Sequence, residues 1–223
     1  MPDHLRRAGF GACKGFMSPV DPAAAASICR SLRRSRPYRE VRALLTDWTS
    51  GGAAHRRLIA ACSGGPDSTA LLLVLWALRE PLQLTVHVVC VDHQLRAESA
   101  AEAAQVCAVA ARLGLSAEQV PVVCPPGPSK MAAARAARYA ALAAAAQRQG
   151  AAAVLVAHTQ QDQTETMLMR WLAGSGLWGL CGMEARRELP VAGQPAGAVT
   201  LLRPLLSTSR AEVEALLQRA AAL

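Results

Sequence analysis

Residues 58–78 read LIAACSGGPDSTALLLVLWAL, and this stretch decides the fold. The apolar run Leu58–Cys62 predicts a strand that is buried on both faces. Ser63–Gly65 form a short polar turn, and Pro66 suits the first turn of the apolar helix that follows. A strand, a tight turn and a helix in this order predict an α/β fold with a parallel sheet.

The same alternation continues through the rest of the chain. Short apolar runs predict five strands, at residues 58–62, 84–91, 120–123, 154–157 and 199–202. Segments of helical length rich in Ala and Leu predict five helices, at about 68–79, 97–113, 129–149, 161–172 and 209–220. We therefore expect a doubly wound, mostly parallel five-stranded sheet with helices on both faces. Ligands of such folds gather beyond the carboxyl ends of the strands.

The first 57 residues differ from the rest in charge and in pattern. They carry 11 Lys/Arg against 4 Asp/Glu, whereas residues 58–223 carry 13 against 12. The apolar residues of this segment show no sustained helical or strand periodicity. We therefore expect residues 1–57 to be a poorly ordered or loosely docked basic extension. Residues 58–223 are expected to form one catalytic domain. Met17 is an alternative start. An Arg-rich leader is also typical of organelle transit peptides, although a cytoplasmic location is the main expectation.

Composition excludes several classes of protein. With 52% hydrophobic and 18% charged residues, the chain can bury a sizeable core and is not disordered throughout. The longest apolar run, Ala70–Leu78, is far shorter than the roughly 20 residues that cross a bilayer, so no membrane span is expected. The 7 cysteines are odd in number and include no C-x-x-C pair, which favours reduced thiols over a zinc ribbon or a disulfide framework.

The turn after the first predicted strand is suited to a phosphate group. Gly64 and Gly65 let backbone N–H groups approach an anion, the helix adds its positive dipole end, and the hydroxyls of Ser63 and Ser68 can donate hydrogen bonds. Asp67 would repel a phosphate unless a cation lies between them, and Mg²⁺ is the usual choice. For SGG alone, a glycine turn with a helix cap is the alternative. The chain has no Walker sequence G-x-x-x-x-G-K-[ST], which disfavours classical NTPase chemistry.

Five segments in order resemble a known family. SGGPDS at 63–68 resembles the S-G-G-x-D-S pyrophosphate loop of the N-type ATP pyrophosphatases, which adenylate a substrate and release pyrophosphate. Within that superfamily the chain is similar to the tRNA(Ile)-lysidine synthetases over residues 58–217. The segments that carry this similarity are VDHQLRAES at 91–99, ARAARYAAL at 134–142, the run AHTQQDQTETMLMRWLAGSGLWGLCGM at 157–183, and LLRPLL at 201–206. The resemblance implies an adenine nucleotide alpha hydrolase-like fold.

The resemblance also implies a reaction. ATP adenylates C2 of the wobble cytidine in tRNA(Ile) with a CAU anticodon, and free L-lysine displaces AMP to give lysidine. Carried onto this sequence, the family pattern assigns ATP to Ser63, Gly64, Gly65, Pro66, Asp67 and Ser68, and Mg²⁺ to Asp67. It implies catalytic roles for Asp67, His158, Asp162 and Glu165. It implies contacts with substrate or tRNA for Asp92, His93, Arg96, Arg135, Arg138 and Arg170.

Spacing gives independent support to part of this assignment. His158, Asp162 and Glu165 follow an i, i+4, i+7 pattern, which would align them on one face of a helix. Thr159 and Asp162 also fit a T-x-x-D capping box, so capping alone is the alternative for Asp162, and the two roles are compatible. For Asp92 and His93 the alternatives are a turn residue and a buried histidine, and isolated arginines such as Arg138 are commonly solvated.

The chain departs from the family pattern in places. Gln94 stands where the family has glycine, and Gln161 replaces the first of two paired aspartates. The sequence stops at Leu223, before the aspartate-asparagine motif and the tRNA-binding domains that the resemblance leads one to expect. Three hypotheses follow: a compact or truncated lysidine synthetase, an ATP-binding module that does not engage tRNA, and a tRNA cytidine thiolase. The missing C-x-x-C pair disfavours the thiolase.

Overall fold

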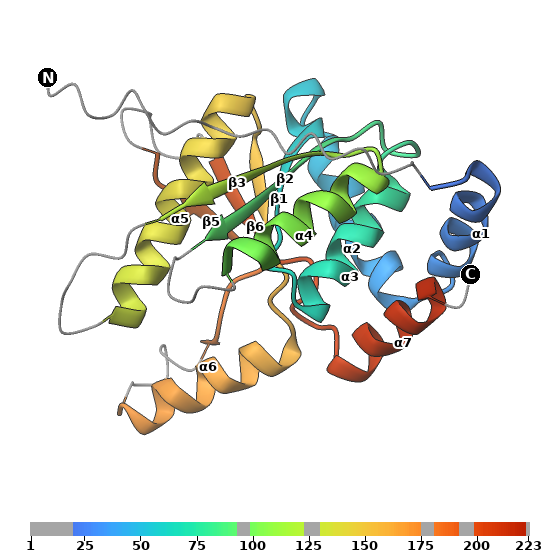
Figure 1. Cartoon of the computed structure of the whole chain (residues 1–223). Helices are drawn as coiled ribbons and strands as arrows, with labels where there is room; N and C mark the ends of the chain where they lie inside the picture. The colour runs from blue at the N-terminus through green and yellow to red at the C-terminus, as the bar shows by residue number, and fades with distance from the viewer. Residues whose placement is uncertain (1–19, 93–98, 123–129, 175–180, 192–198, 222–223) are drawn as a thin grey trace, which may run out of the picture.

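A six-stranded mixed sheet forms the centre of the molecule (Figure 1). The computed structural model describes residues 20–92, 99–122, 130–174, 181–191 and 199–221. The strand order is β3-β2-β1-β4-β6-β5. Five strands run parallel, and β5 pairs antiparallel with β6 at the edge. Their bounds are β1 Arg57–Ala61, β2 Thr85–Asp92, β3 Ser116–Pro121, β4 Ala153–Leu155, β5 Arg186–Leu189 and β6 Val199–Leu202.

The predicted fold class is confirmed, but the predicted number of strands is wrong. All five predicted strands are present, and β5 is the sixth. Its sequence RREL is mostly charged and exposed, so it carries no apolar signal. The start of β3 also differs from the prediction, at Ser116 instead of Val120, because its first residues are polar.

Helices cover both faces of the sheet (Figure 1). Side chains alternate along each strand, so Leu58 and Ala60 of β1 belong to one core cluster and Ile59 belongs to another. The first cluster contains residues of α1, α2, α3, α4 and α7, and the second contains residues of α5. The helix bounds are α1 Pro22–Leu32, α2 Arg36–Thr49, α3 Pro66–Leu78, α4 Ser99–Arg112, α5 Lys130–Gln149, α6 Gln160–Leu172 and α7 Arg210–Ala221, with a 3₁₀ turn, η2, at Ala53–Arg56.

The helix α6 stands apart from this arrangement. It projects from the body of the molecule in Figure 1, and it contributes no buried residue. Within the part of the chain that the structure describes, no helix combines the length and the apolar character that crossing a bilayer requires.

Residues 20–57 differ from the expectation of a poorly ordered extension. They form α1, α2 and η2, and Tyr38, Val41 and Leu45 of α2 are buried in the first core cluster. These three residues recur at helical spacing inside a basic stretch, where the charges hide the pattern. Pro37 lies in the first turn of α2, a position that tolerates proline. Residues 1–19 lie outside the described part of the chain.

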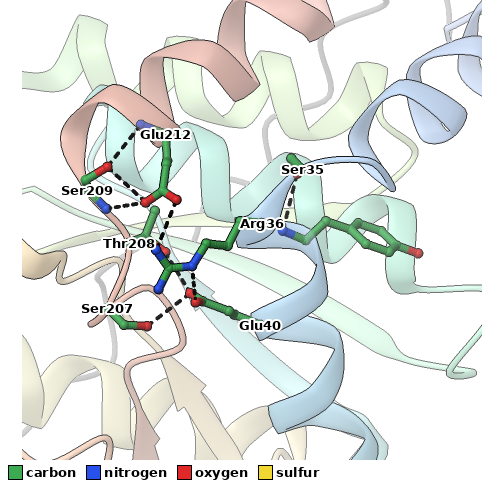
Figure 2. A network of polar contacts seen from close by, with 8 residues as sticks. Ser35, Arg36, Glu40, Ser207, Thr208, Ser209 and Glu212 are labelled. Atoms are coloured by element: carbon green, nitrogen blue, oxygen red, sulfur yellow. Dashed lines mark hydrogen bonds and ion pairs between the residues drawn. The ribbon is translucent and has the colours of Figure 1, made fainter.

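A polar network joins α2 to the segment before α7 (Figure 2). One carboxylate oxygen of Glu40 accepts a hydrogen bond from Arg36 Nε at 2.7 Å. The other accepts from the hydroxyls of Ser207 at 3.0 Å and Thr208 at 3.3 Å. The segment between β6 and α7 is therefore held by a charged group of α2.

The first turn of α7 is closed by a capping box. Glu212 Oε2 accepts hydrogen bonds from the backbone N–H of Ser209 at 2.8 Å and from its hydroxyl at 2.9 Å. Just before this cap, the carbonyl oxygen of Thr208 accepts a hydrogen bond from the backbone N–H of Gln160 at 3.0 Å. The starts of α6 and α7 are thus fixed to each other.

Candidate functional site

The loop between β1 and α3 lies at the carboxyl end of the sheet's parallel strands. Gly64 has a φ of +85°, in the left-handed region that favours glycine, and a Cβ atom there would lie 3.3 Å from Val106 Cγ2. Gly65 has an ordinary φ of −70° and precedes the first residue of α3, Pro66. Of the two glycines, Gly64 therefore makes the tight turn, and Gly65 leads into the helix.

Ser68 organises this loop from within. Its side chain is buried, its Oγ accepts a hydrogen bond from Ser63 N at 3.3 Å, and it donates to the carbonyl oxygen of Gly65 at 2.9 Å. Thr69 Oγ1 donates to the same carbonyl at 2.9 Å. The Ser68 hydroxyl, which we expected to donate to a phosphate group, thus has an internal acceptor, whereas Ser63 is exposed.

A pocket of about 440 Å³ opens beside the loop. The loop supplies one wall, and α5 and the segment between β4 and α6 supply others. Its polar lining consists mainly of residues that the sequence analysis singled out, namely Ser63, Asp67, Ser68, Arg138, His158 and Asp162. On the other side of the loop a pocket of about 520 Å³ has apolar walls formed by Leu72, Val106 and Val109.

Two carboxylates share the polar pocket. Burial raises the pKa of Asp67, the nearby charge of Asp162 raises it further, and the guanidinium of Arg210 acts in the opposite direction. Within the described residues no three His, Cys, Asp or Glu side chains are grouped closely enough to hold a metal ion. A cation beside Asp67 would therefore need further oxygen ligands from outside such a cluster, for example water or a bound phosphate.

Asp162 also caps α6, as one of the two interpretations of the sequence predicted. Its Oδ2 accepts hydrogen bonds from the backbone N–H of Thr159 at 2.7 Å and from the Thr159 hydroxyl at 3.1 Å. The capping box fixes the carboxylate at the start of the helix, where it lines the pocket. Capping and a role in the pocket are therefore compatible in the structure.

His158 contacts an arginine that the sequence analysis missed. Arg203 is buried, and its Nε donates to His158 Nδ1 at 3.2 Å while its Nη1 donates to the carbonyl oxygen of Glu184 at 2.5 Å. Burial, followed by the charge of Arg203, lowers the pKa of His158 to about 4. The imidazole is therefore neutral at pH 7, and because Nδ1 accepts, Nε2 carries the proton. Arg203 is the arginine of the LLRPLL motif, which was its only signal in the sequence.

Glu165 does not join His158 and Asp162 in the pocket. It is exposed, and its Oε1 accepts a hydrogen bond from Gln161 Nε2 at 3.0 Å. The helix α6 projects from the body of the molecule (Figure 1). Asp162 in its first turn lines the pocket, and Glu165, three residues later, does not. The i, i+4, i+7 spacing thus brings together only its first two members.

The structure places the remaining predicted residues away from the pocket or does not describe them. Asp92 is buried at the end of β2 and accepts a hydrogen bond from Gln119 Nε2 at 3.1 Å. Arg170 donates to the carbonyl oxygen of Gly182 at 2.7 Å, and Arg135 is exposed on α5. His93 and Arg96 lie outside the described residues.

Comparisons with known proteins identify the family of this chain. The family model of the PP-loop domain matches residues 35–222. The tRNA(Ile)-lysidine synthase of Novosphingobium aromaticivorans is 46% identical over 164 residues, which are 74% of this chain and 48% of that protein. The enzyme of the same name from Methylobacterium nodulans is 46% identical over 172 residues, 77% of this chain and 48% of that protein. The chain thus spans about half the length of these curated relatives.

A solved structure shows the same fold. The U34-tRNA thiolase NcsA from Methanococcus maripaludis, with its [4Fe-4S] cluster, superposes with a TM-score of 0.60 over 83% of this chain and 62% of that chain. At 15% sequence identity this likeness concerns the fold alone. The family match, by contrast, covers the loop 63–68, the pocket residues Asp67 and Asp162, and nearly all of the described structure. This chain belongs to the PP-loop domain family.

Proposed function

We propose that this chain is the ATP-binding, adenylating part of a tRNA(Ile)-lysidine synthase and acts in the cytoplasm. One observation carries the proposal: the SGGPDS loop at the end of β1 opens onto a pocket that also contains His158 and Asp162. The names of the relatives support the same reaction. Because the chain spans about half of their length, the complete activity with tRNA and lysine belongs to the proposal.

The proposed reaction has two steps. The C2 oxygen of the wobble cytidine attacks the α-phosphorus of ATP, and pyrophosphate leaves. The amine of lysine then attacks C2, the C2–O bond breaks, and AMP leaves with the oxygen while the amine loses a proton. Both steps need stabilisation of negative charge on phosphate oxygens, and the second also needs a proton acceptor.

The loop and α3 would hold the phosphates. Backbone N–H groups of Ser63, Gly64 and Gly65 and the N-terminus of α3 provide hydrogen bonds and a positive dipole end for an anion. Asp67 would hold Mg²⁺, which neutralises charge on phosphate oxygens when it is bound. The position of Asp67 in the first turn of α3 places its carboxylate in the pocket.

Side chains on the opposite wall would act on the reacting groups. The neutral His158, with its proton on Nε2, would donate a hydrogen bond to an oxygen of the nucleotide. Arg138 would neutralise a further phosphate charge, and Asp162 would receive the proton from the lysine amine. Arg203 would position His158 through the hydrogen bond to Nδ1.

Reconstitution tests the proposal. The purified chain is incubated with ATP, L-lysine and a tRNA(Ile) transcript that has a CAU anticodon, and lysine incorporation and pyrophosphate release are measured. Incorporation of lysine into the tRNA supports the proposal. ATP binding without incorporation would instead support an ATP-binding module that does not engage tRNA, the alternative raised by the short span of the chain relative to its relatives.

A variant of Asp67 tests the role of the loop. Asp67→Ala should lower ATP-dependent pyrophosphate release by about 100-fold, because it removes the one carboxylate assigned to the metal. Asp47→Ala is a suitable control, since Asp47 is an exposed acid of α2 that pairs with Arg186 away from the pocket. Unchanged pyrophosphate release in Asp67→Ala would refute the assigned role.

A further inference from the structure

Four arginines gather around one buried tyrosine next to the pocket. The guanidinium carbons of Arg138, Arg135 and Arg187 lie 5.3, 5.7 and 5.8 Å from the centre of the Tyr139 ring. Burial alone would raise the pKa of Tyr139, but the charges of Arg135, Arg138 and Arg203 outweigh it and lower the pKa. We call these four residues, Arg135, Arg138, Arg187 and Arg203, the Tyr139 arginine cluster.

The cluster is assembled from segments far apart in the sequence. Arg135 and Arg138 lie one turn apart on α5, Arg187 lies on the edge strand β5, and Arg203 follows β6. Tyr139 is 7% exposed and packs in the second core cluster, so the ring is a fixed support. Arg135 and Arg187 are exposed, whereas Arg203 is buried. The cluster therefore runs from the interior of the site to the surface.

No carboxylate pairs with the cluster within the part of the chain that the structure describes. The ion pairs found there involve other arginines, and the buried Nε of Arg138 has no hydrogen-bond partner there. Burial lowers the pKa of Arg203, and the charges of Arg187 and Arg135 lower it further against the effect of Tyr139. Three guanidinium groups within 5.8 Å of the centre of one ring carry charges of the same sign, and an anion bound among them would reduce their repulsion.

The position of the cluster indicates which anion it binds. Arg138 belongs both to the cluster and to the pocket lining, so the two sites are continuous. The triphosphate of ATP is assigned to the loop on the other side of the pocket. A strand of RNA whose base enters the pocket would continue outward past Arg135 and Arg187, and phosphodiesters are the groups that paired guanidiniums bind best.

We propose that the exposed members of the Tyr139 arginine cluster, Arg135 and Arg187, bind backbone phosphates of the RNA next to the target nucleotide. Arg187 is a contact outside the nucleotide pocket, whereas Arg138 lines that pocket and the buried Arg203 holds His158. This inference depends on the proposed function, because it takes tRNA as the substrate. Arg187 contributes a charge fixed against an aromatic ring rather than a base-specific contact. It should therefore affect the affinity for tRNA and its dependence on salt.

The neighbouring residue on the same strand supplies a matched control. Successive residues of a strand point to opposite faces, and Arg186 forms an ion pair with Asp47 of α2. The dissociation constant for the tRNA(Ile) transcript is measured for the full chain and for the variants Arg187→Ala and Arg186→Ala, at several salt concentrations. We expect Arg187→Ala to weaken tRNA binding about fivefold at moderate salt and to lower the slope of log K against log [salt] by about 1. Arg186→Ala should leave both unchanged.

Other outcomes separate the possible failures. If wild-type chain binds tRNA and Arg187→Ala has the same salt slope as Arg186→Ala, the inference is overturned and the proposed function stands. If Arg187→Ala weakens ATP binding instead, the cluster serves the triphosphate and the inference is also overturned. If the wild-type chain binds no tRNA at all, the inference about the cluster and the proposed function both fail. Arg187→Lys, which keeps the charge, should restore most of the slope and shows that any loss does not come from misfolding.

Discussion

Gly64 has the most demanding backbone conformation in the proposed ATP site. Its φ of +85° is strained for any residue with a side chain, and a Cβ atom there would lie 3.3 Å from Val106 Cγ2, so that Val106 or the loop would have to shift by a few tenths of an ångström. Gly64→Ala should introduce about 1–2 kcal/mol of strain, which corresponds to about 5- to 30-fold in ATP affinity when binding must restore the loop. Isothermal titration calorimetry with ATP measures this loss.

Gly52→Ala is the control for Gly64→Ala. Gly52 also has a positive φ, +109°, but nothing lies within 4 Å of a Cβ placed there, and it does not line the pocket. Gly52→Ala should lower the free energy of unfolding by an amount similar to Gly64→Ala, and it should leave the affinity for ATP unchanged. Equal ATP affinity in the two variants would show that the conformation of the loop does not matter for binding.

The titration of His158 predicts how stability depends on pH. Its pKa is lowered from 6.5 to about 4 in the folded chain, so the unfolded chain binds the proton more readily. The stability that depends on neutral His158 is therefore complete above about pH 6.5 and is lost as the pH falls towards 4. At 1.36 kcal/mol for each pH unit, the loss amounts to at most about 3 kcal/mol.

A variant without the imidazole isolates this effect. Urea unfolding of the wild-type chain and of His158→Gln, measured between pH 7 and pH 4, gives the two dependences on pH. His158→Gln should lose less stability over this range than the wild-type chain does. Parallel pH dependences would mean that His158 titrates with an ordinary pKa in the folded state.

At the scale of elements, apolar spacing determined which parts could be predicted. The strand of Leu58 was predicted from its continuous apolar run and the long helix α5 from its length and Ala-rich composition, and both were predicted within two residues of their observed bounds. The edge strand β5 reads RREL and packs one side chain, Leu189, so its sequence resembles a loop. The helix α2 was missed because arginines surround its buried Tyr38, Val41 and Leu45.

Some residues of the candidate site could likewise be predicted from the sequence, and others could not. Ser63–Ser68 and the pair His158 and Asp162 follow from local patterns, since each group lies where one strand ends. Arg203 donates a hydrogen bond to His158, and the charge of Arg210 acts to lower the pKa of Asp67. Both arginines lie more than 30 residues after Asp162 in the sequence. No local pattern gives the direction of such side chains, because the packing of β6 and α7 against the rest of the molecule sets it.

The link between α2 and α7 gives a prediction at this scale (Figure 2). Glu40 accepts hydrogen bonds from Arg36, Ser207 and Thr208. Glu40→Gln therefore removes a negative charge that three hydrogen-bond donors share. We expect the free energy of unfolding to fall by about 1–2 kcal/mol. Glu214→Gln, which removes the exposed pair with Arg210, should change it by less than about 0.5 kcal/mol. If urea unfolding gave the same loss of stability for Glu40→Gln and Glu214→Gln, the link between α2 and α7 would contribute no more than an exposed surface ion pair.

On the scale of the whole molecule, the site lies where two separate layers of packing meet. The loop 63–68 and Arg210 come from the side of the sheet covered by α3 and α7, whereas Arg138 comes from α5 on the other side. The pocket exists because the sheet holds both layers at its carboxyl edge. Any element that stabilises one layer therefore affects the site, even when it lies far from the pocket.

The helix α1 tests this dependence, because it precedes the region that matches the PP-loop family model. Leu32, its last residue, is 0% exposed and belongs to the first core cluster together with residues of α3 and α7. Leu32→Ala should lower the free energy of unfolding by about 2–4 kcal/mol in a single transition, as expected for a cavity in a shared core. Leu168→Ala, at a half-exposed position of the projecting helix α6, should lower it by less than about 1 kcal/mol. If α1 were a loosely docked appendage, Leu32→Ala would leave the main unfolding transition unchanged, and the family region alone would account for the stability of the fold.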